Sequence, residues 1–180
     1  MHAMDQRGFT LVETLVAITI IALAIVGPLY AVQQSLNSSR IARDVLIASS
    51  LAQEGVEYVR AVRDGNYLVN LSSPGTRNWL AGFNGSPGGT ASYANCMAAD
   101  CVVDTTQDTI SRTITPLYLS TTGIYNQQGS GTATKFTRTV RLSSVPGSTV
   151  EQILVTVTVS WDLQGKTQSV TVRDNLFNWL

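Results

Sequence analysis

The sequence has few of the residues on which enzymes and nucleic-acid-binding proteins depend. Its only histidine is His2, so histidine-based nucleophilic or acid/base catalysis has no candidate in the rest of the chain. It has neither a glycine-rich dinucleotide motif nor a phosphate-binding P-loop. Only 13% of the 180 residues are charged, and twelve basic residues balance twelve acidic ones. We therefore expect no enzyme, no cofactor and no electrostatic surface for nucleic acid.

Charge is scarcest near the N-terminus. Residues 15–32 form an uncharged, mostly apolar run, interrupted only by Thr19, Gly27 and Pro28. A helix rises by about 1.5 Å per residue, so this run would be roughly 27 Å long, close to the bilayer core of about 30 Å. Extending the helix back to Phe9 would cover that core. We expect a bend or local melting at Gly27 and Pro28, because proline removes a backbone hydrogen bond.

Two ordinary interpretations of this run fit incompletely. A cleavable secretory signal would use Arg7 as its basic region and Ala22-Leu23-Ala24 as its cleavage site. However, apolar residues continue beyond Ala24. In addition, Glu13 lies where a secretory signal would have an uninterrupted hydrophobic stretch. A plain membrane anchor explains the length of the run but leaves the glutamate unexplained.

The order of residues around Glu13 supplies a third interpretation. A polar leader ends in Arg7-Gly8, and Phe9-Thr10-Leu11-Val12-Glu13 and the apolar run follow. This closely resembles the prepilin signature of type IV pilins and type II secretion pseudopilins, over roughly residues 7–60. The resemblance implies that a membrane peptidase removes residues 1–8 by cutting between Gly8 and Phe9. It also implies N-methylation of Phe9.

A carboxylate in this position needs compensation. A charged residue at the centre of a membrane span costs roughly 2.5 to 3.5 kcal/mol, and less toward its edge. Cleavage after Gly8 would create a cationic amine on Phe9, and two unit charges ~4 Å apart attract by about 4 kcal/mol at an effective dielectric near 20. The amine points along its own helix, so we expect Glu13 to pair with Phe9 of a neighbouring subunit. The alternative is that Glu13 stays protonated or reaches lipid head groups.

The helix is expected to continue out of the membrane as an amphipathic segment over residues 33–64. The turn formers Asp64-Gly65-Asn66 predict its end. Glu57 and Arg60, three residues apart, indicate a solvated face. The opposite, packing face is predicted from apolar and small residues at spacings of three and four: Ile41, Val45, Ala48, Ala52, Val56, Val59 and Val62.

Residues 65–180 are expected to form an exported, β-rich head. Residues 70–95 are rich in turn formers and predict an irregular loop. A three-stranded antiparallel meander is predicted from alternating segments at 136–142, 150–161 and 167–173, and a further strand is possible at 109–115. On the middle strand the alternation predicts one buried face: Ile153, Val155, Val157, Val159 and Trp161. The expected fold is therefore α+β and pilin-like, with a long helix packed on a small antiparallel sheet.

The two cysteines, Cys96 and Cys101, predict a disulfide, since the head is expected outside the cytoplasm. A metal pair is the lesser alternative. The spacing of Asp100, Asp104 and Asp108 resembles a calcium loop, but it is not that of an EF-hand, and loop-capping carboxylates are the favoured interpretation.

Three tryptophans complete the set of candidates. An adhesive surface is conceivable, but buried aromatics and a C-terminal anchor at residues 176–180 are favoured for Trp79, Trp161 and Trp179.

The combined expectation is a structural subunit, more similar to minor than to major pilins, of a type IV pilus or a type II secretion pseudopilus. Its partners would be other pilin subunits, the prepilin peptidase and methylase, the inner-membrane assembly platform and, before assembly, the membrane. The resemblance places the leader in the cytoplasm and the head outside. Rival interpretations are an uncleaved, membrane-anchored adhesion module and a secreted hydrolase. No basic cluster supports a variant specialised in DNA uptake.

Overall fold

The structure is a computed structural model that describes residue 8, residues 10–147 and residues 151–178. The chain divides into two compact units, residues 1–44 and residues 45–180. A long helix, α1 (Leu11–Ser72), begins in the first unit and ends in the second, and the described strands all follow it in the second unit. The predicted α+β class, with a long N-terminal helix and small antiparallel sheets, is confirmed.

The predicted helix end at residues 64–66 is wrong. All three residues are helical, and α1 continues to Ser72. Asn66 explains the difference, because its side-chain amide donates to two carbonyl oxygens of the loop that follows the helix, at 3.2 and 2.9 Å. This tertiary contact outweighs the weak helix propensity of asparagine. The helix ends before Pro74, which cannot continue it, and Gly75, which has a left-handed φ of 75°.

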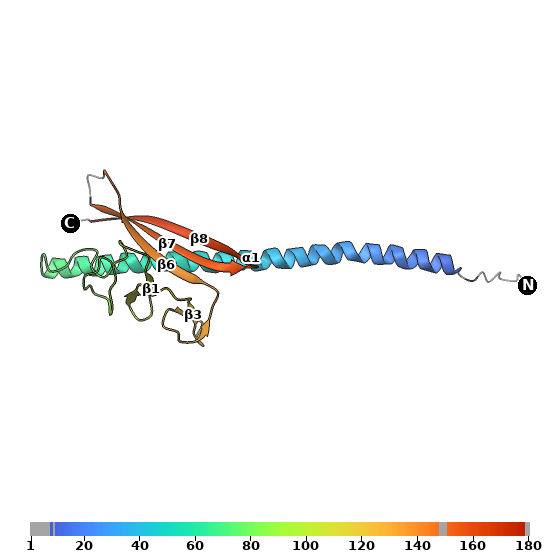
Figure 1. Cartoon of the computed structure of the whole chain (residues 1–180), viewed down its shortest axis with the longest axis horizontal. Coiled ribbons are helices and arrows are strands. Elements are labelled where there is room, and N and C mark those ends of the chain that lie inside the picture. The colour runs from blue at the N-terminus through green and yellow to red at the C-terminus, as the bar shows by residue number, and fades with distance from the viewer. Residues whose placement is uncertain (1–7, 9, 148–150, 179–180) are drawn as a thin grey trace, which may run out of the picture. The chain divides into compact units, whose positions relative to one another are not determined.

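The main sheet is the predicted antiparallel meander. Its strands β6 (Thr137–Ser144), β7 (Gln152–Leu163) and β8 (Lys166–Phe177) lie in chain order, with β7 in the middle. The turn between β7 and β8 has two residues, Gln164 and Gly165, with φ of 55° and 76°. Positive φ at both positions defines a tight hairpin turn whose twist suits the flanking strands. Figure 1 shows the three strands in orange and red.

The inner face of the main sheet packs on the second half of α1. The predicted face of β7 is buried, and so are the predicted helix residues from Ala48 to Val59. Both sets belong to one hydrophobic cluster. Val45 departs from the prediction because it is 39% exposed, while Leu51 and Tyr58 join the core without having been predicted.

A glycine lets the helix and the sheet approach each other closely. A Cβ atom at Gly55 would lie 2.9 Å from Cγ1 of Val157 and 3.3 Å from Cδ of Arg138. Real Cβ atoms essentially never approach a neighbour as closely as the 2.9 Å to Val157, so a larger residue would force the helix and sheet to shift.

Arg138, on the inner face of β6, is a charged core residue that sequence reasoning missed. Its side chain is only 1% exposed. Nη1 donates to the carbonyl oxygen of Leu51 at 3.1 Å and lies 3.3 Å from a carboxylate oxygen of Glu54, while Nη2 donates to the carbonyl oxygen of Val103 at 2.9 Å. Burial lowers the pKa of Arg138, and the nearby Glu54 charge opposes this. The guanidinium thereby links α1, β6 and the segment around Val103.

The rest of the head is irregular chain with very short strands. The predicted loop at residues 70–95 begins only after α1: residues 70–72 are helical, and residues 73–95 form turns and bends without a named strand. The predicted strand at 109–115 is reduced to three residues, paired with β1. The short strands are β1 (Val102–Asp104), β2 (Thr109–Ser111), β3 (Tyr118–Leu119), β4 (Tyr125–Asn126) and β5 (Thr132–Ala133). They form a β1-β2 pair and a β4-β3-β5 sheet.

Candidate functional site

Thr10 defines the start of α1 and thereby the position of Glu13. Its backbone oxygen accepts hydrogen bonds from the backbone N–H groups of Glu13 and Thr14, at 3.1 and 3.2 Å, and its Oγ1 accepts from the Glu13 N–H at 3.3 Å. Thr10 is therefore the N-cap, and Glu13 is the third residue of the helix. Sequence reasoning missed this cap, although threonine followed three residues later by glutamate is a known signal for it.

The Glu13 side chain is exposed, in the first turn of an otherwise apolar segment. Within the described part of the chain, no residue donates a hydrogen bond to its carboxylate or forms an ion pair with it. The N-terminal end of a helix carries a partial positive charge, which favours a carboxylate there by about 0.3 to 1 kcal/mol. This is smaller than the cost of placing a charge in hydrocarbon, so the carboxylate remains available to an external cation.

The segment after Glu13 exposes an almost continuous apolar surface. Thirteen large hydrophobic residues from Leu11 to Val32 are exposed, with values that range from 49% at Val16 to 79% at Leu11. By length and composition, α1 is the one helix in the described residues that is able to cross a membrane. Burying one such side chain contributes about 1.5 to 3 kcal/mol, so this surface needs lipid or another protein to cover it.

Gly27 and Pro28 lie inside the continuous helix. The pair does not interrupt α1, so the local melting that we considered does not occur. Pro28 lacks the N–H that would bond to the carbonyl oxygen of Ala24, so this helical hydrogen bond does not form. A bend at this pair stays a prediction.

The predicted processing site lies at the edge of the described chain. Gly8 is exposed, and a Cβ atom built on it would meet nothing within 4 Å. Phe9, predicted to become the methylated N-terminus and the partner of Glu13, lies outside the described residues, as does the leader up to residue 7. Cleavage, methylation and the charge pair stay predictions.

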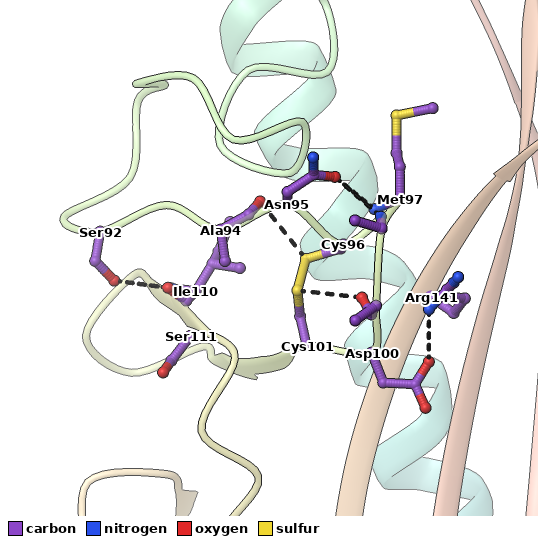
Figure 2. Close-up of a disulfide and its surroundings, with 12 residues drawn as sticks. Ser92, Ala94, Asn95, Cys96, Met97, Asp100, Cys101, Ile110, Ser111 and Arg141 are labelled. Atoms are coloured by element: carbon purple, nitrogen blue, oxygen red, sulfur yellow. Dashed lines mark hydrogen bonds and ion pairs between the residues drawn. A yellow bond between two sulfur atoms is a disulfide. The ribbon is translucent and has the colours of Figure 1, made fainter.

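Cys96 and Cys101 form the predicted disulfide, so they are not a metal pair. Both are fully buried, and Figure 2 shows the short loop between them beside β6. Cys101 and Val140 exchange two backbone hydrogen bonds, at 2.9 and 2.8 Å, and the Leu142 N–H donates to the carbonyl oxygen of Cys96 at 3.1 Å. The disulfide loop therefore covers the outer edge of β6.

The three aspartates of the possible calcium loop have separate partners. Asp100 lies 3.5 Å from Arg141, an exposed ion pair visible in Figure 2. Asp108 accepts a hydrogen bond from the Tyr58 hydroxyl at 2.8 Å. Burial, this hydrogen bond and the Asp108 charge raise the pKa of Tyr58, so its hydroxyl stays protonated. The described residues contain no group of three His, Cys, Asp or Glu that could hold a metal ion.

Asp104 is a buried loop-capping carboxylate, as the favoured interpretation required. One oxygen accepts from the backbone N–H and the hydroxyl of Thr106, at 2.9 and 2.6 Å, and the other accepts from the Gln127 N–H at 2.9 Å. Burial by itself would raise the pKa of Asp104, but these hydrogen bonds outweigh it and hold the pKa below its usual value.

Two of the tryptophans are buried, as predicted. Trp79 and Trp161 are about 5% and 4% exposed. The Trp79 indole donates to Glu151 at 3.0 Å, and the same carboxylate accepts from the Asn178 side chain at 2.7 Å. Glu151 therefore ties the C-terminal segment to the loop that follows α1. Trp179 lies outside the described residues.

The fold and the exposed helix define a class of protein: one whose head buries its own core and whose N-terminal helix segment exposes an apolar surface suited to lipid or to other protein chains. Comparison with known proteins makes this more specific. Residues 3–27 match the family model of the prokaryotic N-terminal methylation motif. No curated protein and no solved structure matches the chain.

The methylation motif and the apolar helix together support a type IV pilin or pseudopilin. The match spans Gly8, Phe9 and Glu13, the residues on which the sequence resemblance depends. A pilin-type motif points to a structural protein rather than to an enzyme, and it fits a protein anchored in a membrane by its N-terminal helix.

Proposed function

We propose that the protein is a minor structural subunit of a type IV pilus or a type II secretion pseudopilus, and that it assembles through α1 after its leader is removed. One observation carries the proposal. The apolar side chains of residues 11–32 are exposed, and the one acidic or basic residue of this segment, Glu13, has no partner in the described chain.

Processing supplies the missing cation in this proposal. A prepilin peptidase cuts between Gly8 and Phe9, and the methylase modifies the new amine of Phe9. Thr10 caps the helix just after this bond, so the residue before the cleavage point, Gly8, stays outside the helix and accessible. The amine of one subunit then pairs with Glu13 of the next and sets the axial register of assembly.

Two environments cover the apolar surface in turn. Before assembly, residues 11–32 of α1 lie in the cytoplasmic membrane with the head on the outer side. The inner-membrane assembly platform then extracts the subunit, and neighbouring helices replace lipid around residues 11–32. Apolar burial holds the resulting bundle together, and the charge pair orders it, because an unpaired charge in the bundle costs several kcal/mol.

Substitution of Glu13 tests the pairing. Glu13→Gln keeps the shape of the side chain and removes its charge, so we expect the fraction of the protein in sheared surface filaments to fall by about tenfold or more, equivalent to about 1.4 kcal/mol. Glu57→Ala is the matched control, because Glu57 is an exposed glutamate on the same helix. Normal incorporation of the Gln variant would favour a protonated or lipid-facing Glu13 and would overturn the pairing.

A further inference from the structure

The two edges of the main sheet differ. The outer edge of β6 is covered by the disulfide loop, and Phe136, just before β6, accepts a hydrogen bond from the Leu117 N–H at 2.8 Å. At the other edge, β8 is paired over twelve residues with β7 alone. Among the described residues, no backbone hydrogen bond joins residues 166–176 of β8 to anything except β7. Long open edges are rare in proteins because they attract other strands.

The ladder determines which β8 backbone groups are free. Val140 directs its N–H and C=O to Cys101, away from β7, so the opposed pair Val140 and Val157 is not hydrogen-bonded. In an antiparallel ladder, a residue directs both its N–H and its C=O to the same neighbouring strand. Because Val157 does not bond to Val140 on β6, it exchanges both hydrogen bonds with its partner on β8, Val172. The outward N–H and C=O groups of β8 therefore belong to alternate residues, Thr167, Ser169, Thr171, Arg173 and Asn175.

The apolar face of the sheet is incomplete at this edge. On the central strand, Val157 and Val159 are fully buried, whereas their β8 partners Val170 and Val172 are only half-buried. A further strand beside β8 would extend the sheet and cover these two valines. Its own inward side chains would need to be apolar or β-branched.

The charges of β8 indicate what kind of strand fits. Lys166 and Arg173 are exposed, and no ion pair involves either of them within the described part of the chain. The acid of this strand, Asp174, is already paired with Arg60 at 2.9 Å. The open edge is therefore basic, and a second β8 edge would bring like charges together. A segment with acidic residues opposite Lys166 and Arg173 would complement it.

We infer that the outer edge of β8 binds an extended, acid-bearing segment of a neighbouring subunit by strand addition in the assembled filament. This inference rests on the proposed function, and it adds a head-to-head contact to the helix bundle. The backbone ladder would supply affinity, while the valine pair and the two basic residues would select the partner.

Hydrogen exchange in native filaments and in the detergent-solubilised full chain tests the ladder directly. In the solubilised protein, we expect the amides of Thr167, Ser169, Thr171 and Arg173 to exchange much faster than that of Val172. In filaments they should slow by about tenfold or more, because they become hydrogen-bonded. If the protein is in the filament and these amides still exchange fast, the inference is overturned while the proposed function stands. Failure of the wild-type chain to enter any filament would overturn both.

Charge reversal is the second test and does not threaten the fold. The double variant Lys166→Glu with Arg173→Glu should enter filaments about tenfold less than the wild type, a change of about 1.4 kcal/mol. The matched control is Arg112→Glu, a charge reversal at an exposed arginine outside the main sheet. Equal incorporation of the double variant and the control would contradict a docked acidic strand.

Discussion

At the scale of single residues, Glu13 and Arg138 are two ionisable groups in apolar surroundings, and the protein treats them differently. Arg138 is buried in the head and receives two carbonyl oxygens and one carboxylate from the chain itself. Among the described residues, Glu13 is stabilised only by its position at the N-terminal end of a helix. The first arrangement completes a core, and the second leaves a carboxylate that, in the proposed function, pairs with the Phe9 amine of another subunit.

Gly55 is the residue whose small size the head requires most clearly. Gly55→Ala should destabilise the head by about 1 to 3 kcal/mol, because its Cβ would overlap Val157. Urea unfolding of the full chain in detergent, followed by circular dichroism, measures the change.

Gly65→Ala is the matched control for this substitution. Gly65 lies in the same helix, and a Cβ atom there meets nothing within 4 Å. Alanine should therefore stabilise the helix by about 0.5 to 1 kcal/mol. Equal effects of the two substitutions would show that helix propensity, and not close packing at residue 55, governs both.

Asp104 makes the head sensitive to acid. Its pKa is lower in the folded state than in the unfolded chain, where it is about 3.9. Its contribution to stability is therefore fully present above about pH 4 and is lost as the pH falls through the folded-state pKa. We expect the thermal midpoint of the full chain in detergent to fall as the pH is lowered below about 4, because the unfolded chain then binds a proton more readily than the folded Asp104 does. Asp104→Asn should show a smaller fall, and an identical fall would assign the acid sensitivity to other carboxylates.

At the scale of secondary-structure elements, the disulfide loop acts as an edge cover. The backbone of Cys96 and Cys101 occupies the outer side of β6, where an unpaired strand would otherwise be open. The disulfide closes a short loop, and this keeps the backbone of the loop aligned with β6.

Removal of the disulfide tests this role. Cys96→Ser with Cys101→Ser should lower the stability of the head by about 2 kcal/mol, the loop-entropy value for a loop this short. Hydrogen exchange should quicken first at the amides of Val140 and Leu142, which bond to the loop. If these amides remain as protected as in the wild type, the loop holds its place without the disulfide.

The sequence predicts the elements that have a strong period and misses those that depend on tertiary contacts. Strict alternation locates β7 and its buried face, and the two-residue turn sets the hairpin with β8. The end of α1 is mispredicted because Asn66 is held in the helix by bonds to a distant loop. The strands β3 to β5 have two residues each, too few to show a period. The burial of Arg138 follows from oxygens contributed by two other segments, which no local pattern reveals.

At the scale of the whole molecule, the chain combines a head that buries its own core with a helix segment that buries almost nothing. Leu11 to Val32 stay exposed, while the core residues of the head are sealed by α1 and the main sheet. A chain of this kind is incomplete as a monomer in water. The apolar segment and the processing motif could be predicted from the sequence, because length, hydropathy and the order of residues from Gly8 to Glu13 depend only on neighbours in the chain. The open β8 edge could not, because it depends on which strands pair.

The central claim is that a trimmed N-terminus makes this helix an assembly element, and the mass of the N-terminal peptide of the native protein tests it most directly. We expect mass spectrometry of protein from sheared filaments to find a chain that begins at Phe9 and carries one added methyl group. A native chain that retains residues 1–8, or one that begins after Ala24, would contradict the account.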